Sequence, residues 1–203
     1  MRVPEVSVVV CAFNEEQFIG RCLRSLAAQL FEMPIEVVVV DDASTDRTVE
    51  VVRSFEDFLP IRILRNASNR GIGFSSSKGV MESTGRFVVR VDADDFVSEH
   101  FVKVLHLAVS SNRPDEAARC DYVVVDVFGS PIKRENADEK PIACGIMMSR
   151  ESVFSVGLYQ TNLRVGEDVE FEARFKERFT ITRVPIPLYR YRSHDNNSSG
   201  GPQ

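Results

Sequence analysis

Three aspartates stand within four residues where a run of apolar, largely β-branched residues ends. The stretch VVRVDADDFV, at positions 88–97, contains Asp92, Asp94 and Asp95. Carboxylates this close repel one another, and a hard cation such as Mg²⁺ or Mn²⁺ bound to their oxygens would remove that repulsion. Such a cation would also stabilise the charge that develops on a departing diphosphate. A simpler explanation, that the aspartates cap turns and the following helix, stays open from these residues alone.

A second acidic pair follows another apolar run. Asp41 and Asp42 end the stretch IEVVVVDD, and Phe13 follows the first apolar run, VSVVVCA. One carboxylate of the pair would accept a hydrogen bond from the N3–H of a uracil-type base or from a ribose hydroxyl. The Phe13 ring would then flank that base. The alternative is that one aspartate only caps the loop before the next helix.

Three further side chains are candidates for a chemical role. Asp168, after Glu167, opens the stretch GEDVEFEARFKERF, and is either a general base for an acceptor hydroxyl or an acid that complements a helix dipole. His194 follows the last apolar stretch and is a metal ligand, a phosphate donor or a surface residue. Lys78 either reaches a phosphate or lies on a helix surface. The glycines of GIGFSSSKG match no phosphate-loop pattern and predict a tight turn.

Strands and helices alternate through the first half of the chain. Strands are predicted at 6–12, 35–40, 61–64 and 87–91. Their apolar character is typical of a parallel sheet with helices on both faces, which is an α/β, Rossmann-like architecture. Right-handed crossovers bring the carboxyl ends of such strands to one edge, where ligands bind. The residues expected to meet there are Phe13, Asn14, Asp41, Asp42, Asn69, Arg70, Asp92 and Asp94.

The helices between these strands have recognisable end signals. Asn14, with Gln17 three residues later, predicts the start of a helix whose apolar stripe reaches Leu30. Ser44 is expected to cap the second helix. Gly85 is expected to close the third helix. One face of that third helix is predicted to carry Phe74, Ser77, Lys78 and Met81.

The second half is less regular. Strands are predicted at 122–127, 142–148 and 181–184, with a polar loop or hairpin between the first two. Phe171, Phe175 and Phe179 recur at the spacing of an amphipathic helix. We expect one domain over residues 1–203, with a nucleotide-binding half (1–97), an acceptor and catalytic half (98–192) and a polar tail (193–203).

Composition excludes several classes of protein. The chain has 203 residues and a formal net charge of −5, with no basic excess, so no nucleic-acid partner is expected. Its start lacks the layout of a signal peptide, and no apolar run reaches the ~20 residues of a transmembrane segment. The four cysteines form no CxxC pair, which favours buried thiols in a reducing, cytoplasmic setting.

An ordered set of motifs resembles the family 2 glycosyltransferases. The matching stretches are SVVVCAFNEE, VVVVDDASTDRT, NRGIGFSSSKG, STGRFVVRVDADD, GEDVEFEARF and LYRYRSHDNNSS. The resemblance covers nearly the whole chain and implies the GT-A fold, a Rossmann-like three-layer sandwich with a mostly parallel central sheet. It also implies an inverting, metal-dependent hexosyl- or related transferase that uses a nucleotide-diphosphate sugar, with a UDP-sugar expected first. The acceptor would be a glycan or a lipid-linked saccharide.

The resemblance also implies a role for individual residues. Phe13 and Asp42 would hold the base, and Asp92 would contact the ribose or the metal. Asp94, in the DXD motif, would bind Mn²⁺ or Mg²⁺ and the diphosphate, with His194 joining the metal site. Asp168 would be the catalytic base.

Two features depart from the family pattern. Lys78 stands where such proteins often have Arg or Asn, which leaves its phosphate contact open. The QxxRW motif of processive membrane-bound synthases is absent, which favours single-sugar transfer by a soluble or peripherally membrane-associated enzyme.

Two other functions compete with sugar transfer. A nucleotidyltransferase of related fold should have a glycine-rich, basic loop after the first strand, where this chain has CAFNEEQF. A non-catalytic nucleotide-binding module should have lost Asp94 or Asp168, and both are present.

Overall fold

The computed structural model describes residues 3–111, 117–163 and 166–193. Within these residues the strands are β1 (Val6–Ala12), β2 (Ile35–Asp41), β3 (Ile61–Arg65), β4 (Phe87–Arg90), β5 (Phe96–Val97), β6 (Ala117–Val125), β7 (Pro131–Glu135), β8 (Ile146–Ser149) and β9 (Ile181–Arg192). The helices are α1 (Ile19–Ala27), α2 (Thr48–Arg53), α3 (Ile72–Glu82), α4 (Phe101–Ser111), α5 (Arg150–Val156) and α6 (Glu167–Lys176).

All the strands belong to one sheet with the order β3-β2-β1-β4-β8-β6-β9-β5, and β7 pairs with β6. Strands β1 to β4 pair only in parallel with one another, as their apolar sequences predict. Strand β8 then lies antiparallel between β4 and β6. The parallel half therefore presents the carboxyl ends of β1, β2 and β4 side by side, which is the edge expected to bind ligand.

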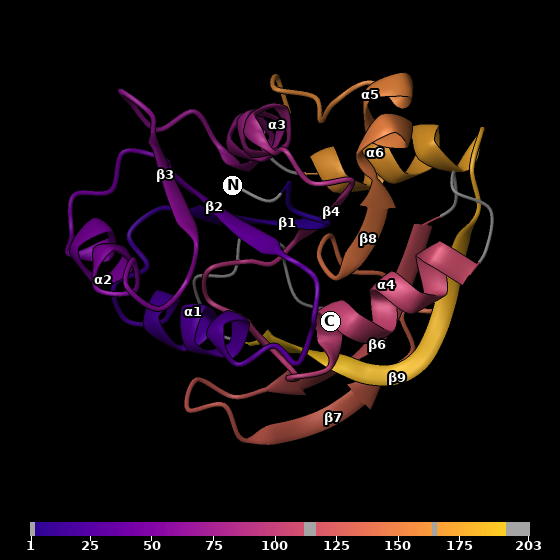
Figure 1. Ribbon diagram of the computed structural model, residues 1–203, viewed down its shortest axis with the longest axis horizontal. Coiled ribbons are helices and arrows are strands. Elements are labelled where there is room, and N and C mark those ends of the chain that lie inside the picture. Colours follow the sequence, from indigo (N-terminus) through magenta and orange to yellow (C-terminus); the bar gives the residue numbers. More distant parts are fainter. Residues whose placement is uncertain (1–2, 112–116, 164–165, 194–203) are drawn as a thin grey trace.

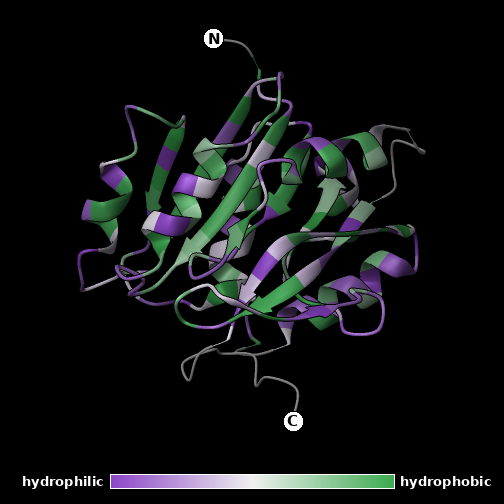
Figure 2. Cartoon of the chain, turned by 90° about the horizontal axis from the view of Figure 1, so that it is seen from below, coloured by the Kyte–Doolittle hydropathy of each residue, from purple (hydrophilic) through white to green (hydrophobic). Residues whose placement is uncertain are grey.

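Helices cover both faces of the sheet and give the predicted three layers. Figure 1 shows α1, α2 and α4 on one side and α3, α5 and α6 on the other. Two hydrophobic clusters match these layers, one containing α1 and α4 side chains and the other containing α3, α5 and α6 side chains. Figure 2 shows hydrophobic residues along the central strands and hydrophilic residues on the outer surfaces of the helices. The predicted α/β class and three-layer architecture are confirmed.

Helices α1 and α2 begin later than predicted, because residues before them bind across two loops. Asn14 has a φ of 56°, and its Oδ1 accepts a hydrogen bond from Thr45 N at 2.8 Å. Ser44 Oγ accepts one from Asn14 N at 3.0 Å. Helix α1 begins only at Ile19 and α2 only at Thr48. The prediction that Asn14 and Ser44 cap helices is therefore wrong, and these residues instead fasten the loop after β1 to the loop after β2.

Helix α3 contacts the sheet through small residues. A Cβ atom added to Gly79 would lie 2.4 Å from Val9 Cγ1, so the helix approaches β1 more closely than any larger side chain allows. Of the four residues predicted to share one face, Ser77 is buried and Met81 is exposed. Glycines and serines form most of the buried face, whose residues are Gly73, Ser75, Ser76, Ser77, Gly79 and Val80.

Two predicted helix ends are also wrong. Helix α3 ends at Glu82 and Ser83 is already extended, so Gly85 does not cap it. A Cβ atom at Gly85 would lie 2.6 Å from Ser7 Oγ, and the glycine serves a close approach to β1 instead. Leu30 lies beyond the end of α1 and is 52% exposed.

The second half has the predicted strands with different lengths, since β6 and β9 are longer than predicted and β8 is shorter. The polar segment between β6 and β8 contains β7, which pairs antiparallel with β6, so it is a hairpin. Phe171 and Phe175 are buried in α6, with Phe179 packed against the same cluster. Strand β9 extends to Arg192, whereas the predicted strand ended at residue 184. Among the described helices, none has the length and apolar character required to cross a bilayer.

Candidate active site

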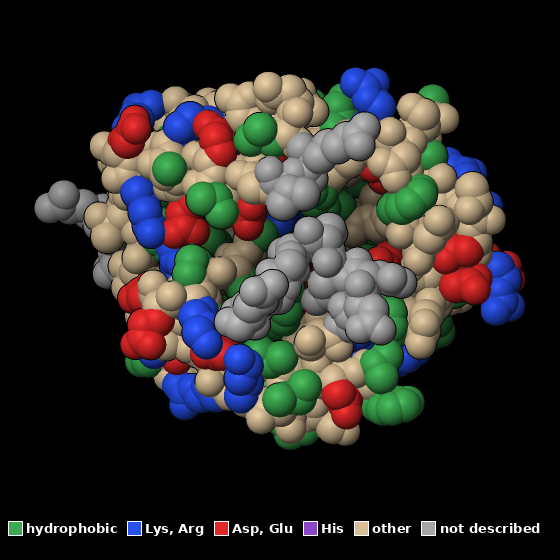
Figure 3. Space-filling model, turned by 180° about the vertical axis from the view of Figure 1, so that it is seen from behind, with side chains coloured by type: hydrophobic (Ala, Val, Ile, Leu, Met, Phe, Trp, Pro, Cys, Tyr) green, Lys and Arg blue, Asp and Glu red, His purple; other side chains and the backbone are tan. Residues whose placement is uncertain are grey.

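A cleft of about 780 Å³ opens at the carboxyl ends of the parallel strands. The loops after β1, β2 and β4 line it together with the start of α6. Figure 3 looks onto this face, which is hollowed near its centre, with acidic side chains at the margins of the hollow. The cleft brings together five residues that the sequence singled out, namely Phe13, Asp42, Asp92, Asp94 and Asp168.

The three aspartates after β4 form one cluster with two different environments. Each of Asp92, Asp94 and Asp95 offers a carboxylate oxygen, and these atoms lie within 4.8 Å of one another. Asp95 is buried, and it accepts hydrogen bonds from Tyr189 Oη and from Arg192 N, each at 2.7 Å. Burial, reinforced by Asp94 and Asp92, raises the pKa of the Asp95 carboxyl well above its usual range. Asp95 therefore anchors β9 to the acidic loop, while Asp92 and Asp94 are half-buried in the cleft.

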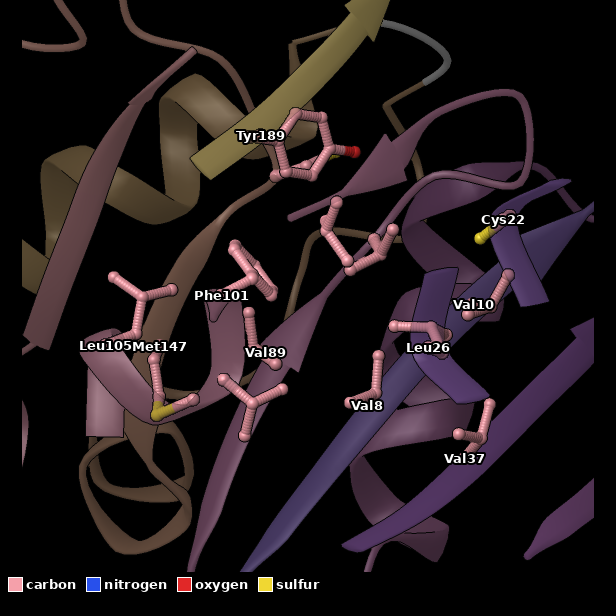
Figure 4. Packing of buried hydrophobic residues seen from close by; sticks show 14 of the residues in the cluster. Val8, Val10, Cys22, Leu26, Val37, Val89, Phe101, Leu105, Met147 and Tyr189 are labelled. Carbon is pink, nitrogen blue, oxygen red and sulfur yellow. The ribbon is translucent and has the colours of Figure 1, made fainter. Parts of the chain in front are cut away.

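Tyr189 connects this anchor to the rest of the loop. Its hydroxyl accepts a hydrogen bond from Asp92 N at 3.1 Å while it donates to Asp95. Figure 4 shows its ring at the edge of the cluster that contains Val89 and Phe101, with the hydroxyl pointing away from them. The loop is thus held from inside the protein. Its all-oxygen donor set fits a hard divalent cation.

Asp42 shapes the opposite end of the cleft. Its carboxylate accepts hydrogen bonds from Asn66 Nδ2 at 2.7 Å, Arg70 N at 2.9 Å and Gly71 N at 2.8 Å. It thereby fixes the loop after β3, which lines the cleft together with Phe13, a residue that is 44% exposed. Asp41, by contrast, is buried outside the cleft lining and pairs with Arg65.

One predicted site residue lies outside the cleft lining, and another lies outside the described residues. Lys78 Nζ donates to Asn66 Oδ1 at 2.8 Å and to Arg65 O at 3.0 Å, and Lys78 is not among the lining residues. In this geometry the ammonium supports the loop after β3, and the phosphate contact stays a prediction. His194 lies outside the described residues, although Tyr191, three residues earlier, lines the cleft.

The acidic pair at the start of α6 also divides into two environments. Glu167 is 4% exposed, and its Oε1 lies 3.6 Å from Arg90 Nη1. Burial raises the pKa of the Glu167 carboxyl above its usual range, although Arg90 opposes this shift. Asp168 is half-buried and faces both the cleft and a small apolar notch beside it. Both acids line the cleft, and Asp168 is the more exposed of the two.

Sequence reasoning missed two residues of the cleft, Glu15 and Arg90. Burial, then Asp94 and Asp92, raise the pKa of Glu15 to about 8. Its position after the first strand was the available signal. Arg90 stood out as a charged residue inside an apolar strand.

The parallel sheet with an acidic cleft at its carboxyl edge is the architecture of the GT-A glycosyltransferases. The sequence profile described as Glycosyl transferase family 2 matches residues 7–152, which is more than half of the chain. The chain belongs to this family. The resemblance noted from the motifs is thereby confirmed.

Several known proteins are similar over much of the chain. The uncharacterized glycosyltransferase EpsJ of Bacillus subtilis (strain 168) is 31% identical over 96% of this chain and 63% of its own length. The poly(ribitol-phosphate) beta-N-acetylglucosaminyltransferase TarS of Staphylococcus aureus (strain MW2) is 36% identical over 84% of this chain and 30% of its own length. The chain therefore spans only part of these relatives.

Solved structures share the fold. The crystal structure of S. aureus TarS 1-349 in complex with UDP-GlcNAc has a TM-score of 0.81 and 22% identity, covering 97% of this chain and 61% of that one. The mannosyltransferase PcManGT from Pyrobaculum calidifontis, in complex with GDP-Man and Mn²⁺, has a TM-score of 0.77 and 20% identity, covering 97% and 59%.

Proposed function

We propose that the chain transfers a sugar from a nucleotide-diphosphate sugar to an acceptor hydroxyl with inversion at the anomeric carbon. The observation that carries this proposal is that Asp94 and Asp168 line the same cleft as Phe13 and Asp42. Donor-binding groups and a candidate base therefore border one cavity, which is of ordinary size for a small-molecule site.

On the donor side, the base would lie beside Phe13 and the loop that Asp42 holds. Asp94 and Asp92 would hold Mn²⁺ or Mg²⁺, and His194 is proposed as a further ligand. A cation bound there would stabilise the charge on the departing diphosphate. Asp92 Oδ1 is buried and lies 3.4 Å from Arg90 Nε, so this carboxylate has a fixed place beside the proposed cation.

On the acceptor side, Asp168 would accept the proton of the attacking hydroxyl. The acceptor oxygen forms a bond to the anomeric carbon while the bond from that carbon to the diphosphate oxygen breaks, and the electron pair leaves with the diphosphate. Attack from the face opposite the leaving group inverts the anomeric configuration. Glu167 is less suited to this step, because it is buried against Arg90.

The neighbours support the choice of donor and metal. TarS 1-349 has a structure with UDP-GlcNAc, and PcManGT has one with GDP-Man and Mn²⁺. We propose a UDP-sugar as donor and a glycan or lipid-linked saccharide of the cell surface as acceptor. All four cysteines are buried free thiols, which supports a reducing, cytoplasmic setting.

The test is a panel of UDP-, GDP- and dTDP-sugars incubated with the protein and Mn²⁺ or Mg²⁺, with release of nucleoside diphosphate as the readout. One donor is expected to be turned over by the wild type. The Asp168→Asn variant should lose turnover by a factor of about 100 or more while it still binds the nucleotide. Turnover that survives this substitution would remove Asp168 from its proposed role.

The competing functions would give different results. A nucleotidyltransferase would join a sugar phosphate to a nucleoside triphosphate and release pyrophosphate from the triphosphate. A non-catalytic module would be stabilised by nucleotide and metal without consuming any donor.

A further inference from the structure

Arg90 is a buried cation in the floor of the cleft. It ends strand β4, is 6% exposed and lines the cleft. Its Nη1 donates to Ser76 Oγ at 3.3 Å, and its Nη2 donates to Cys144 Sγ at 3.7 Å. Neither partner is charged in its ordinary state, so these contacts orient the guanidinium but do not balance its charge. A buried cation without an anion would be strongly unfavourable.

Two carboxylates provide that balance, and they come from opposite sides of the site. Arg90 Nε lies 3.4 Å from Asp92 Oδ1, and Arg90 Nη1 lies 3.6 Å from Glu167 Oε1. Asp92 is two residues before Asp94 on the proposed donor side. Glu167 directly precedes Asp168, the proposed base. One guanidinium thus connects the metal-binding loop with the first turn of α6.

The surroundings of Glu167 leave its side chain little freedom. A Cβ atom at Gly73 would lie 3.3 Å from Glu167 Cγ, so α3 closes one side of it. The Tyr159 ring lies 5.5 Å from Arg90 Cζ and stacks on Phe171 of α6 at 4.5 Å between ring centroids. Movement of Arg90 would therefore be transmitted to the start of α6.

We propose that Arg90 is a positioning residue of the transfer reaction, which sets the base-bearing turn of α6 relative to the acidic loop by binding Glu167 and Asp92 together. This inference rests on the proposed function, because it assigns Arg90 to the same cleft. Arg90 acts through Glu167 on the placement of Asp168. Displacement of a reacting group by about 1 Å can slow a reaction about 100-fold.

A second buried arginine provides a matched control. Arg119 is 3% exposed and pairs with Glu172 of the same helix α6, and it donates to Ala137 O at 3.1 Å. Arg119 does not line the cleft. A role limited to holding α6 on the sheet would make the two arginines equivalent.

The experiment compares Arg90→Lys with Arg119→Lys, using kcat, KM for the donor, the Kd of UDP with Mn²⁺ and the melting temperature. Arg90→Lys should lower kcat on the order of 100-fold, since a lysine ammonium cannot span both carboxylates. The Kd of UDP with Mn²⁺ should change by less than about threefold. Arg119→Lys should lower the melting temperature with kcat within about threefold of wild type. Parallel losses in the two variants would overturn the proposal.

A double-mutant cycle approaches the same point from the other partner, and its single variant Glu167→Gln keeps the test valid if the Arg90 variants fold poorly. Glu167→Gln alone should lower kcat to a similar extent as Arg90→Gln. The double variant should lose no more than about threefold beyond the worse single variant, because both changes break one connection. Effects that multiply would show that Arg90 acts independently of Glu167, which contradicts the proposal.

The wild type separates this inference from the proposed function. Absence of turnover with every donor would count against sugar transfer itself. Turnover by the wild type, together with equal kcat in Arg90→Lys and wild type, would refute only the role of Arg90.

Discussion

Replacement of Tyr189 by phenylalanine tests whether β9 holds the acidic loop in place. The substitution removes one hydroxyl and keeps the buried ring. That hydroxyl donates to Asp95 Oδ2 at 2.7 Å and accepts from Asp92 N at 3.1 Å. Because burial raises the pKa of the Asp95 carboxyl well above its usual range, both contacts count as hydrogen bonds between neutral groups, each of which contributes ~0.5–1.5 kcal/mol. We therefore expect the free energy of unfolding to fall by about 2 kcal/mol.

For a chain of this length, 1 kcal/mol corresponds to about 2–4 °C in melting temperature, so Tyr189→Phe should lower it by roughly 4–8 °C. Tyr122→Phe is the matched control, because Tyr122 is also buried and its hydroxyl donates one hydrogen bond, to Lys140 O at 3.0 Å. It should lower the melting temperature by roughly 2–4 °C.

The functional part of the same experiment measures the stabilisation that UDP with Mn²⁺ confers. Loosening Asp92 and Asp95 should weaken metal binding, so Tyr189→Phe should lose much of this stabilisation and Tyr122→Phe should keep it. The reasoning is refuted by equal melting temperatures in the two variants, or by full ligand stabilisation of Tyr189→Phe.

Three further outcomes are expected. Asp94→Ala should remove the dependence of UDP binding on Mn²⁺ in a thermal-shift assay, and an unchanged metal dependence would place the ion elsewhere. The raised pKa of Glu15, about 8, should make the metal-free protein lose stability as pH rises from about 4.5 through 8, since the folded state holds a proton that the unfolded state has released. Urea unfolding at pH 6 and pH 9 should show this loss of stability in the wild type and a smaller loss in Glu15→Gln. Equal losses in the two proteins would contradict the raised pKa of Glu15. Gly79→Ala should lower the free energy of unfolding by about 1–3 kcal/mol, because the added Cβ atom would clash with β1. Gly20→Ala is the control: no side-chain atom beyond its chain neighbours lies nearer than 3.4 Å to its added Cβ atom, so it should leave the free energy of unfolding unchanged or raise it by up to about 1 kcal/mol. Equal urea midpoints in the two variants would argue against the close contact.

The gathering of site residues at one sheet edge could be predicted because it depends on few rules. Apolar runs of strand length indicated buried parallel strands, and parallel strands with right-handed crossovers bring their carboxyl ends together. Phe13, Asp42 and Asp94 lie far apart in sequence, yet this topology alone places them around one cleft. No side-chain detail was needed for that step.

The direction of individual side chains could not be predicted, because it depends on partners distant in sequence. The burial of Asp95 follows from Tyr189 and Arg192, which are 94 and 97 residues away. Lys78 turns to Asn66 and away from the cleft for a similar reason. Asn14 and Ser44 had ordinary capping sequences, but binding between the two loops replaced capping. Local sequence contains no information about such choices.

Each acidic pair at this edge consists of a buried anchor and a more exposed neighbour. All four acids line the cleft, but Asp95 and Glu167 are buried, with Asp95 bound by Tyr189 and Glu167 beside Arg90, whereas Asp94 and Asp168 are half-buried. A buried carboxylate that accepts several hydrogen bonds or faces a guanidinium has a fixed orientation, and this fixes the backbone of its neighbour. Adjacent acids therefore have unlike roles, and substitution of an anchor should reduce stability and activity together, whereas substitution of its neighbour should reduce activity alone.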